Sequence, residues 1–232
     1  MTLFVHETHH VRGKSEDDFE AAYRDEWMPA LAGDDDARLL WFCHHAHGSG
    51  VAYNVVTITG VRDGAAWERL ARRVQDGDLA KWAAKVDEMR HGLDAKMLVP
   101  VPWSPMQDVD LGAVPTDPQS HELSLYMEDT GWPHHNNIDA YMDFAGRNYA
   151  PLLPNSGFLR MEASFRPVYG THRRAEMILM QKVLDYDRLA GLLTSEVRPE
   201  YRKKGTWMHD ALDVRDKWES RLLRTTAWSP WY

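Results

Sequence analysis

The sequence predicts an α+β fold in which one β-α-β-β-α-β unit occurs twice and the two copies form an intrachain α/β barrel. Three observations predict this fold class. The chain repeats itself in order, both halves show the same succession of strand and helix patterns, and each half alone would leave one face of its sheet uncovered.

The repeat appears when Thr2 is aligned with Ser124, because about thirty residues then correspond without a gap. "LFVHET" matches "LYMEDT", "DDFEAAY" matches "DAYMDFA", and "MPAL" matches "APLL". Further on, "AYNVVTITGVRDGAAWERL" matches "AEMILMQKVLDYDRLAGLL", and "LVPVPWSPM" matches "LRTTAWSPW". The order indicates a tandem duplication, with a first repeat at 1–106, a linker rich in Pro, Asp and Gly at 107–121, and a second repeat at 122–232.

Each half begins with a strand and a helix. The segments 2–8 and 122–129 carry the aromatic and β-branched residues typical of short strands. The segment 15–31 predicts a helix with Ser15 as N-cap and acidic residues in its first turn. Phe19, Tyr23 and Trp27 stand four residues apart on one face of that helix.

The remaining elements complete the unit. The segment 37–61 predicts a hairpin that turns at "HGSG", and 64–75 and 78–93 have the apolar spacing of packed helices. The segment 95–102 predicts a last strand, and its prolines favour a sheet edge. The resulting order is the ferredoxin-like split β-α-β unit. Its open sheet face needs a partner, and the second copy supplies one, sheet against sheet.

The repeated first helix carries a pattern, F-x(3)-Y/F followed by aromatic-x-P-x-L, that resembles the dimeric α/β-barrel superfamily. Within it the closest likeness is to EthD-like proteins, with NIPSNAP-like proteins near. EthD-like proteins usually carry His two positions before that proline, where this chain has Trp27 and Tyr149. The superfamily includes cofactor-free monooxygenases, cyclases, isomerases, dehydratases and haem enzymes, so the resemblance implies the fold and leaves the activity open.

Strand alternation predicts a polar cluster inside the barrel in the second repeat. Tyr126 and Glu128 share one face of their strand. In the next strand Leu159, Met161, Ala163 and Phe165 should pack under the helices. The residues expected to point into the barrel from there onward are Arg160, Glu162, Ser164 and Glu176. An ion pair of Arg160 with Glu162 or Glu176, without a catalytic part, is the alternative interpretation.

The first repeat predicts a more aromatic lining. Phe4 and His6 should face the barrel from the first strand, Leu40, Phe42 and His44 from the second, and Tyr53 and Val55 from the third. Cys43 and Trp41 are then expected under the helices. Trp27 and Tyr149, from the repeated helix, should each cover one end of the cavity. His6 and Glu128 occupy the same place in the two copies, which favours a role shared across the pseudo-twofold axis.

Composition limits the class of partner. The net charge is −8, from 35 acidic against 27 basic residues, which argues against a nucleic-acid or anionic-membrane surface. No apolar run approaches the roughly 20 residues of a membrane span, and the first residues do not have a signal-peptide pattern. Cys43 is the single cysteine, so no internal disulfide forms and a cytoplasmic location is expected.

The twelve histidines raise the question of a metal. His9, His10, His134 and His135 are expected in strand-to-helix loops, and His44 and His45 should point to opposite faces. No H-E-x-x-H or cysteine-pair signature is present. We therefore expect no cofactor, with a protein-bound metal as the less favoured alternative and haem behind it.

These observations predict an enzyme that performs cofactor-independent acid/base chemistry on an aromatic or polyketide-like molecule, by elimination, isomerisation or cyclisation. The predicted catalytic residues are His6, His44, Glu128, Arg160 and Glu162. Predicted to bind substrate are Phe4, Trp27, Phe42, Tyr53, Tyr126, Tyr149, Ser164 and Glu176. The alternatives are a non-catalytic carrier of a hydrophobic ligand, a cofactor-free monooxygenase, and a metal or haem enzyme. The only protein partner expected from the sequence is a second copy of the chain, in a homodimer.

Overall fold

A computed structural model describes residues 1–171 and 174–232 and shows a mixed α+β fold, as predicted. The chain divides into two compact units. The first unit comprises Met1–Val99, Gln107–Ser124 and Leu222–Tyr232, and the second unit comprises Pro100–Met106 and Leu125–Arg221. Each unit is therefore completed by a segment from elsewhere in the chain.

The first unit contains an antiparallel sheet in the order β4-β1-β3-β2, and the last residues of β8 continue it beside β2. The register is set by pairs such as Glu7↔Thr57 and Cys43↔Thr225. Its strands are β1 (Leu3–Val11), β2 (Ala37–His45), β3 (Asn54–Val61) and β4 (Arg90–Pro100).

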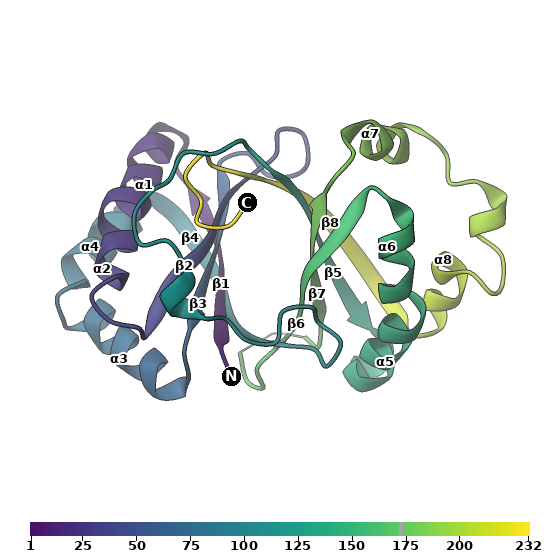
Figure 1. Cartoon of the computed structure of the whole chain (residues 1–232), viewed down its shortest axis with the longest axis horizontal. Coiled ribbons are helices and arrows are strands. Elements are labelled where there is room, and N and C mark those ends of the chain that lie inside the picture. Colours follow the sequence, from purple (N-terminus) through teal and green to yellow (C-terminus); the bar gives the residue numbers. More distant parts are fainter. Residues whose placement is uncertain (172–173) are drawn as a thin grey trace. The chain divides into compact units, whose positions relative to one another are not determined.

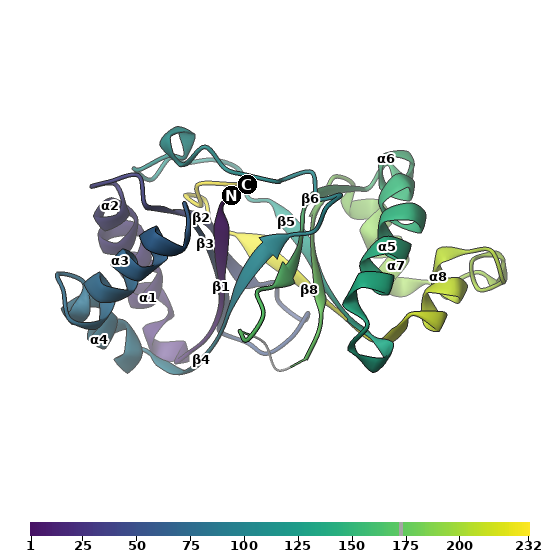
Figure 2. The same ribbon diagram turned by 90° about the horizontal axis from the view of Figure 1, so that it is seen from below.

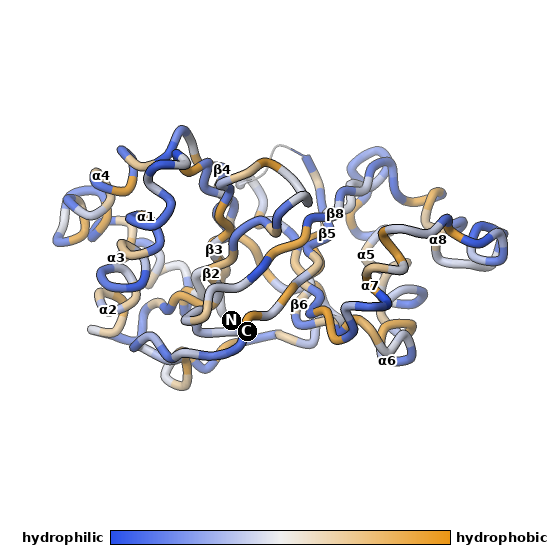
Figure 3. Tube along the Cα trace, turned by 90° about the horizontal axis from the view of Figure 1, so that it is seen from above, coloured by the Kyte–Doolittle hydropathy of each residue, from blue (hydrophilic) through white to orange (hydrophobic). Residues whose placement is uncertain are grey.

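Helices cover one face of this sheet (Figure 1). They are α1 (Glu16–Ala22), a π-helical turn (Tyr23–Trp27), α2 (Met28–Leu31), α3 (Gly64–Gln75) and α4 (Ala80–Glu88). Phe19, Tyr23 and Trp27 lie in the apolar core between the helices and the sheet, as their spacing predicts. In Figure 3 apolar residues follow β2 and β3 through this layer.

Two local predictions for this unit need correction. Ser15 is the N-cap residue of α1, as predicted, but its side chain makes no capping hydrogen bond, and it also ends a 3₁₀ turn (Gly13–Ser15) that precedes the helix. The helix expected at 78–93 ends at Glu88, and the chain enters β4 at Arg90, where pairing with β1 takes over the backbone hydrogen bonds.

The second unit repeats the same order of elements. β7 pairs with β5 and with β6, both antiparallel, and helices lie on one face of the sheet (Figure 2). The strands are β5 (Leu125–Pro133), β6 (Leu159–Pro167), β7 (Met177–Val183) and β8 (Arg215–Thr225). The helices are α5 (Ile138–Asn148), α6 (Leu153–Ser156), α7 (Tyr186–Thr194) and α8 (Trp207–Asp210). Both units thus show the predicted ferredoxin-like β-α-β-β-α-β order.

A β-bulge occurs at the same place in both units. The register shifts between Leu39 and Trp41 in β2, and between Met161 and Ala163 in β6, positions 122 residues apart. A bulge inserts one residue into a strand, so every later side chain moves to the other face. The two units therefore share a backbone irregularity as well as the order of elements.

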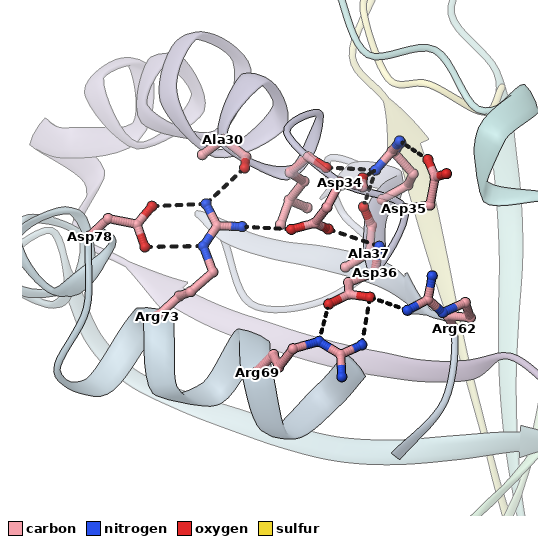
Figure 4. Close-up of polar contacts among 11 residues, drawn as sticks. Ala30, Asp34, Asp35, Asp36, Ala37, Arg62, Arg69, Arg73 and Asp78 are labelled. Atoms are coloured by element: carbon pink, nitrogen blue, oxygen red, sulfur yellow. Dashed lines mark hydrogen bonds and ion pairs between the residues drawn. The ribbon is translucent and has the colours of Figure 1, made fainter. Parts of the chain in front are cut away.

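The turn before β2 is held by an arginine-rich network (Figure 4). Asp36 accepts hydrogen bonds from Arg69 at 2.5 and 2.7 Å and from Arg62 at 2.5 Å. The Asp36 side chain is only 14% exposed. Buried Arg38 donates to the backbone carbonyl of Leu31 at 2.6 Å. These contacts join the end of α2, the turn and α3.

We expect Asp36→Asn to lower the melting temperature by about 2–4 °C, because charge-assisted hydrogen bonds from two arginines are lost at a mostly buried carboxylate. The matched control is Asp143→Asn, which removes an exposed pair with Arg147 on α5 and should shift it by less than about 1 °C. Thermal unfolding followed by circular dichroism measures both. Equal shifts would show that the Asp36 network contributes no more than a surface ion pair.

Candidate functional site

A pocket of about 250 Å³ lies in the first unit between the sheet and its helices. Its walls are largely aromatic, and two charged side chains reach it from the strands. Its lining includes Glu7, Tyr23, Trp27, Thr59, Trp82 and Arg90. We call it the helix-side pocket.

The aromatic wall comes from the π-helical turn and from α4. The Trp27 and Trp82 rings stack with centroids 4.4 Å apart and 15° between their planes. Tyr23 meets Trp82 edge-on at 5.3 Å. Flat, closely packed rings of this kind hold planar apolar ligands at low cost in side-chain entropy.

A polar cluster forms the base of the pocket. The Arg90 guanidinium donates to Nδ1 of His9 at 2.8 Å. Because arginine can only donate, the proton of His9 must be on Nε2. Nε2 lies 3.0 Å from the Thr57 hydroxyl, and Thr57 donates to Oε2 of Glu7 at 3.4 Å. The hydrogen bonds therefore run from Arg90 through His9 and Thr57 to Glu7.

The side chains differ in how far they reach toward solvent. His9 is fully buried, whereas the Glu7 side chain remains 20% exposed and lines the pocket. Glu7 is thus the acid of this cluster that a ligand can reach.

Burial sets the protonation states. It raises the pKa of Glu7 above its usual value, against the lowering effects of the Arg90 charge and of the Thr57 hydrogen bond. Burial, followed by the Arg90 charge, lowers the pKa of His9 well below its usual value, so the ring is neutral. Burial and the charge of Glu7 raise the pKa of Tyr23 well above its usual value. A carboxyl group with a raised pKa in an apolar pocket is a typical general acid or base.

The second unit has a related cluster that is closed. Asp129 stands 122 residues after Glu7 and is buried. It accepts a hydrogen bond from Nε2 of Gln181 at 2.7 Å and another from Ser220. The Tyr149 hydroxyl donates to Oε1 of Gln181. Burial raises the pKa of Asp129 to about 6, although the bonds from Ser220 and Gln181 act to lower it.

Two aligned substitutions explain why His9 has no counterpart there. The position 122 residues after His9 is Gly131, and the one 122 residues after Phe19 is Tyr141. A Cβ atom on Gly131 would lie 2.1 Å from the Tyr141 hydroxyl oxygen. The tyrosine therefore needs a glycine opposite it, whereas the Phe19 ring packs against His9 with centroids 5.1 Å apart.

Sequence reasoning placed four of the predicted residues on the correct sheet face. Phe4 and His6 are buried on the face of β1 opposite the helices, since Val5 and Glu7 face the helix-side pocket. In β5, Tyr126 and Glu128 likewise alternate with helix-facing Asp129. They are buried residues of the face away from the helices, as predicted.

The predicted sheet face of Phe42 and His44 is wrong, because the bulge at Leu40 reverses the alternation in β2. Phe42 packs against Phe19 and Tyr23 in the helix-covered core. Trp41 and Cys43 consequently take the opposite face, and Val55, paired with His44, joins the core under the helices.

His44 instead reaches the carboxylates of α1. Its Nε2 lies 3.0 Å from Glu20, and its Nδ1 lies 3.1 Å from Glu16. Burial acts to raise the pKa of Glu20, but hydrogen bonds from His44 and Trp228 outweigh it and leave that pKa lowered. The indole of Trp228 donates to Glu20 at 2.7 Å, so this cluster holds the C-terminal segment on α1.

Three predicted aromatic residues also lie elsewhere than expected. Tyr53 precedes β3, has a positive φ of 63° and is 50% exposed, because the turn and not the strand sets its direction. Trp27 and Tyr149 do occupy equivalent positions, but both face the helix side of their sheets. Trp27 lines the helix-side pocket, and Tyr149 bonds to Gln181.

The other polar residues of the second unit are divided. Arg160 and Glu162 form an ion pair at 2.5 Å, and the Arg160 side chain is 58% exposed, which agrees with the alternative interpretation. Ser164 was wrongly assigned, because the bulge in β6 turns its hydroxyl toward Met161 on the helix side and moves Ala163 and Phe165 away from it. Glu128 pairs with Arg221 of β8, which sequence reasoning missed, and buried Glu176 adds to the negative potential at that arginine.

Glu7 and Arg90 were missed as well, although a signal was present. "LFVHET" and "LYMEDT" each place an acid at the last position but one, where strand alternation points toward the helices. An ionisable residue on a face expected to be apolar, found twice, marks a buried polar site. Strand alternation cannot predict the position of Arg90, because the apolar spacing of 78–93 predicts a helix there.

The histidines do not gather as ligands. His9 and His10 lie within β1 and not in a loop, whereas His134 and His135 form a turn after β5. Over residues 1–171 and 174–232 no group of three or more His, Cys, Asp or Glu side chains is placed to hold a metal ion. The helix-side pocket does not fit haem, because both ring nitrogens of His9, the histidine in its polar cluster, are engaged by Arg90 and Thr57. None of the described helices is long and apolar enough to cross a membrane.

Comparison with known proteins identifies the fold. No protein-family model matches the sequence, and no curated protein matches it. Among solved structures, an anthrone oxidase-like protein is similar with a TM-score of 0.62 at 9% identity, over 97% of this chain and 91% of the other. A protein from Lactobacillus acidophilus, provisionally assigned as a monooxygenase, gives 0.59 at 8% identity over 99% and 97%.

A variant of chlorite dismutase from Candidatus Nitrospira defluvii gives a TM-score of 0.55 at 7% identity, over 97% of this chain and 91% of that chain. At such identities the likeness shows a shared architecture and carries no residue role from one protein to another. The chain therefore has the two-repeat ferredoxin-like fold of these proteins, and its activity has to be argued from its own site.

Proposed function

We propose that the protein is an enzyme that moves a proton on a small aromatic molecule bound in the helix-side pocket, with Glu7 as the general base and acid. The observation that carries this proposal is a partly accessible carboxylate with a raised pKa at the base of an aromatic pocket. A volume of about 250 Å³ lies just under the 300–1,000 Å³ typical of ligand sites, which favours a compact molecule of one or two rings.

The chemistry follows from the two charges. Ionised Glu7 takes a proton from a carbon next to a carbonyl group, and the C–H electron pair moves onto the carbonyl oxygen to give an enolate. The positive charge of Arg90 lines the same pocket and favours that anion. Return of the proton from Glu7 to another atom completes an isomerisation, and loss of a leaving group completes an elimination.

Thr57 and His9 act as positioning residues. The Thr57 hydroxyl fixes one oxygen of Glu7, and His9 fixes the direction of that hydroxyl. His9 is neutral, and its orientation is fixed by Arg90. It therefore supports an ionised Glu7 through Thr57 without forming an ion pair with that carboxylate itself.

Proton transfer at the opposite sheet face stays a second proposal, with His6, Glu128 and the residues around it as predicted from the sequence. The buried ion pair of Glu128 with Arg221 supports it. A buried ion pair can equally well be a purely structural contact. Glu7, whose carboxylate faces a pocket, is therefore the better-supported candidate for the catalytic base.

An oxygen-dependent reaction is the second candidate function. Two structures of the same fold are described as an anthrone oxidase-like protein and, provisionally, as a monooxygenase. Removal of a proton by Glu7 would be the first step there too, and molecular oxygen would then be the oxidant of the enolate.

Membership of the EthD-like group and a homodimer remain parts of the proposal, supported by the sequence resemblance. A cytoplasmic location also remains part of it, supported by the single cysteine.

Deuterium exchange tests the proposal directly. The probe is 2-tetralone, a two-ring ketone whose C1 protons are acidic, incubated with the protein in D₂O under nitrogen and followed by proton NMR. We expect the C1 signal to decay faster than in buffer, with saturation. Binding without faster exchange would make the protein a carrier. Oxygen uptake on admission of air, absent from a buffer control, would favour the oxidase reaction.

A further inference from the structure

Equivalent positions in the two repeats can be compared directly, because each repeat surrounds them differently. A constant offset of 122 residues relates Val5–Thr59 in one sheet to Met127–Gln181 in the other, since both pairs are direct partners in the strand register. The same offset relates Glu7 to Asp129 and Trp27 to Tyr149. The pocket residues therefore have known counterparts in the second unit.

In the second unit a side-chain carboxamide occupies the centre of this arrangement. Gln181 donates from Nε2 to Asp129 at 2.7 Å and accepts at Oε1 from the Tyr149 hydroxyl. One amide thus links the acid of the first strand to the aromatic donor of the first helix. Asp129 is fully enclosed as a result.

In the first unit the same place lacks its amide. Thr59 stands where Gln181 does and is too short to bridge the acid and the aromatic residue. The indole Nε1 of Trp27 and the Oγ1 of Thr59 are buried, and neither has a hydrogen-bond partner among the residues that the structure describes. Both residues line the helix-side pocket, together with Glu7. A buried donor without an acceptor is unfavourable, so the indole N–H of Trp27 indicates a missing acceptor.

We infer that the helix-side pocket binds an aromatic molecule carrying a carboxamide, or the equivalent pair of a carbonyl and a neighbouring hydroxyl. This inference rests on the proposed function, because it names the ligand class of the same site. The carbonyl oxygen accepts from Nε1 of Trp27, as Oε1 of Gln181 accepts from Tyr149. The N–H or O–H group donates to Glu7, as Nε2 of Gln181 donates to Asp129, and the aromatic ring lies against Trp27 and Trp82.

The first test compares three ligands of one ring system. These are 2-naphthamide, with donor and acceptor, methyl 2-naphthoate, with the acceptor alone, and 2-ethylnaphthalene, with neither. Titration followed by tryptophan fluorescence gives each dissociation constant. We expect the affinity to fall in that order, by about tenfold for each hydrogen bond lost. Equal affinities would overturn the inference, because binding would then follow ring area alone.

The second test uses the repeat itself. Thr59→Gln supplies the first unit with the amide that the second unit has, so we expect binding of 2-naphthamide to weaken at least tenfold. Thr59→Val keeps the smaller volume and should retain binding within about threefold, since the hydroxyl is not the expected partner. Gln181→Thr is the matched change in the second unit and should leave the affinity of the first pocket unchanged.

The outcomes separate this inference from the proposed function. An unchanged circular dichroism spectrum would show that Thr59→Gln is folded. If this folded variant bound 2-naphthamide as tightly as the parent, the inference would be wrong. If 2-tetralone exchange is catalysed by the parent protein in that case, the proposed function stands without it. If Thr59→Gln is unfolded, the three-ligand series still decides. Preference for the amide without any exchange would leave the ligand class standing and reject proton transfer.

Discussion

Replacing Glu7 by glutamine should slow the catalysed deuterium exchange of 2-tetralone by about 10²- to 10⁴-fold, the range typical of losing a general base. The amide has nearly the shape of the carboxylate and can still accept the Thr57 hydrogen bond, but it cannot take a proton from carbon. The exchange rate at saturating probe is the quantity to compare. Probe affinity should change far less, because the aromatic wall is untouched.

The matched control is Asp129→Asn, the same chemical change at the equivalent position of the closed cluster. Because Asp129 is enclosed by Gln181 and Ser220, we expect the exchange rate to stay within about twofold of the parent. The parent rate should rise with pH through the raised pKa of Glu7, since only the ionised form is a base. If Glu128→Gln abolished the catalysed exchange while Glu7→Gln left its rate unchanged, the catalytic site would have to be assigned to the opposite face of the sheet.

The repeat and the order of elements could be predicted because they depend on local signals. Apolar spacing, turn residues and a duplicated pattern are all visible in the chain itself. Face assignments succeeded in β1 and β5, where the strands are regular through Phe4, His6, Tyr126 and Glu128.

The same reasoning failed after each bulge. An added residue at Leu40 or Glu162 has no distinctive sequence signal, yet it reverses the face of His44 and of Ser164. A one-residue shift in register is a tertiary effect that depends on how the neighbouring strand pairs. Of the five predicted site residues in these two strands, Phe42, His44 and Ser164 lie on the face opposite to the predicted one, whereas Arg160 and Glu162 pair with each other.

The helix-side site was missed for a different reason. The helix-covered face of a sheet is expected to be uniformly apolar, so the sequence pattern does not predict a buried acid at Glu7. The cluster also depends on Arg90, which lies 83 positions after Glu7 along the chain. Arg90 contacts His9 only because β4 pairs with β1. Contacts of this kind follow from the strand register, which a single sequence does not specify.

The second large effect concerns stability and pH. Burial raises the pKa of Asp129 from its ordinary value of 3.8 to about 6, which corresponds to about 3 kcal/mol. A carboxyl whose pKa is higher in the folded state binds its proton more tightly there. Its contribution to the free energy of unfolding is therefore complete below about pH 4 and is lost as the pH rises through about 6.

Asp129→Asn removes this titration and keeps one of the two accepting oxygens, so that the amide oxygen can accept from Gln181 while the amide NH₂ can donate to the Ser220 hydroxyl. Relative to the parent, we expect the variant to gain about 3 kcal/mol of unfolding free energy between pH 4 and pH 7, because the parent alone has to bury a charge at the higher pH. Urea unfolding of both proteins across that range measures the difference, in which the titration of all other groups largely cancels. A difference that is constant with pH, or that grows toward acid, would mean that Asp129 is ionised in the folded state without cost and that Gln181 and Ser220 fully replace its hydration.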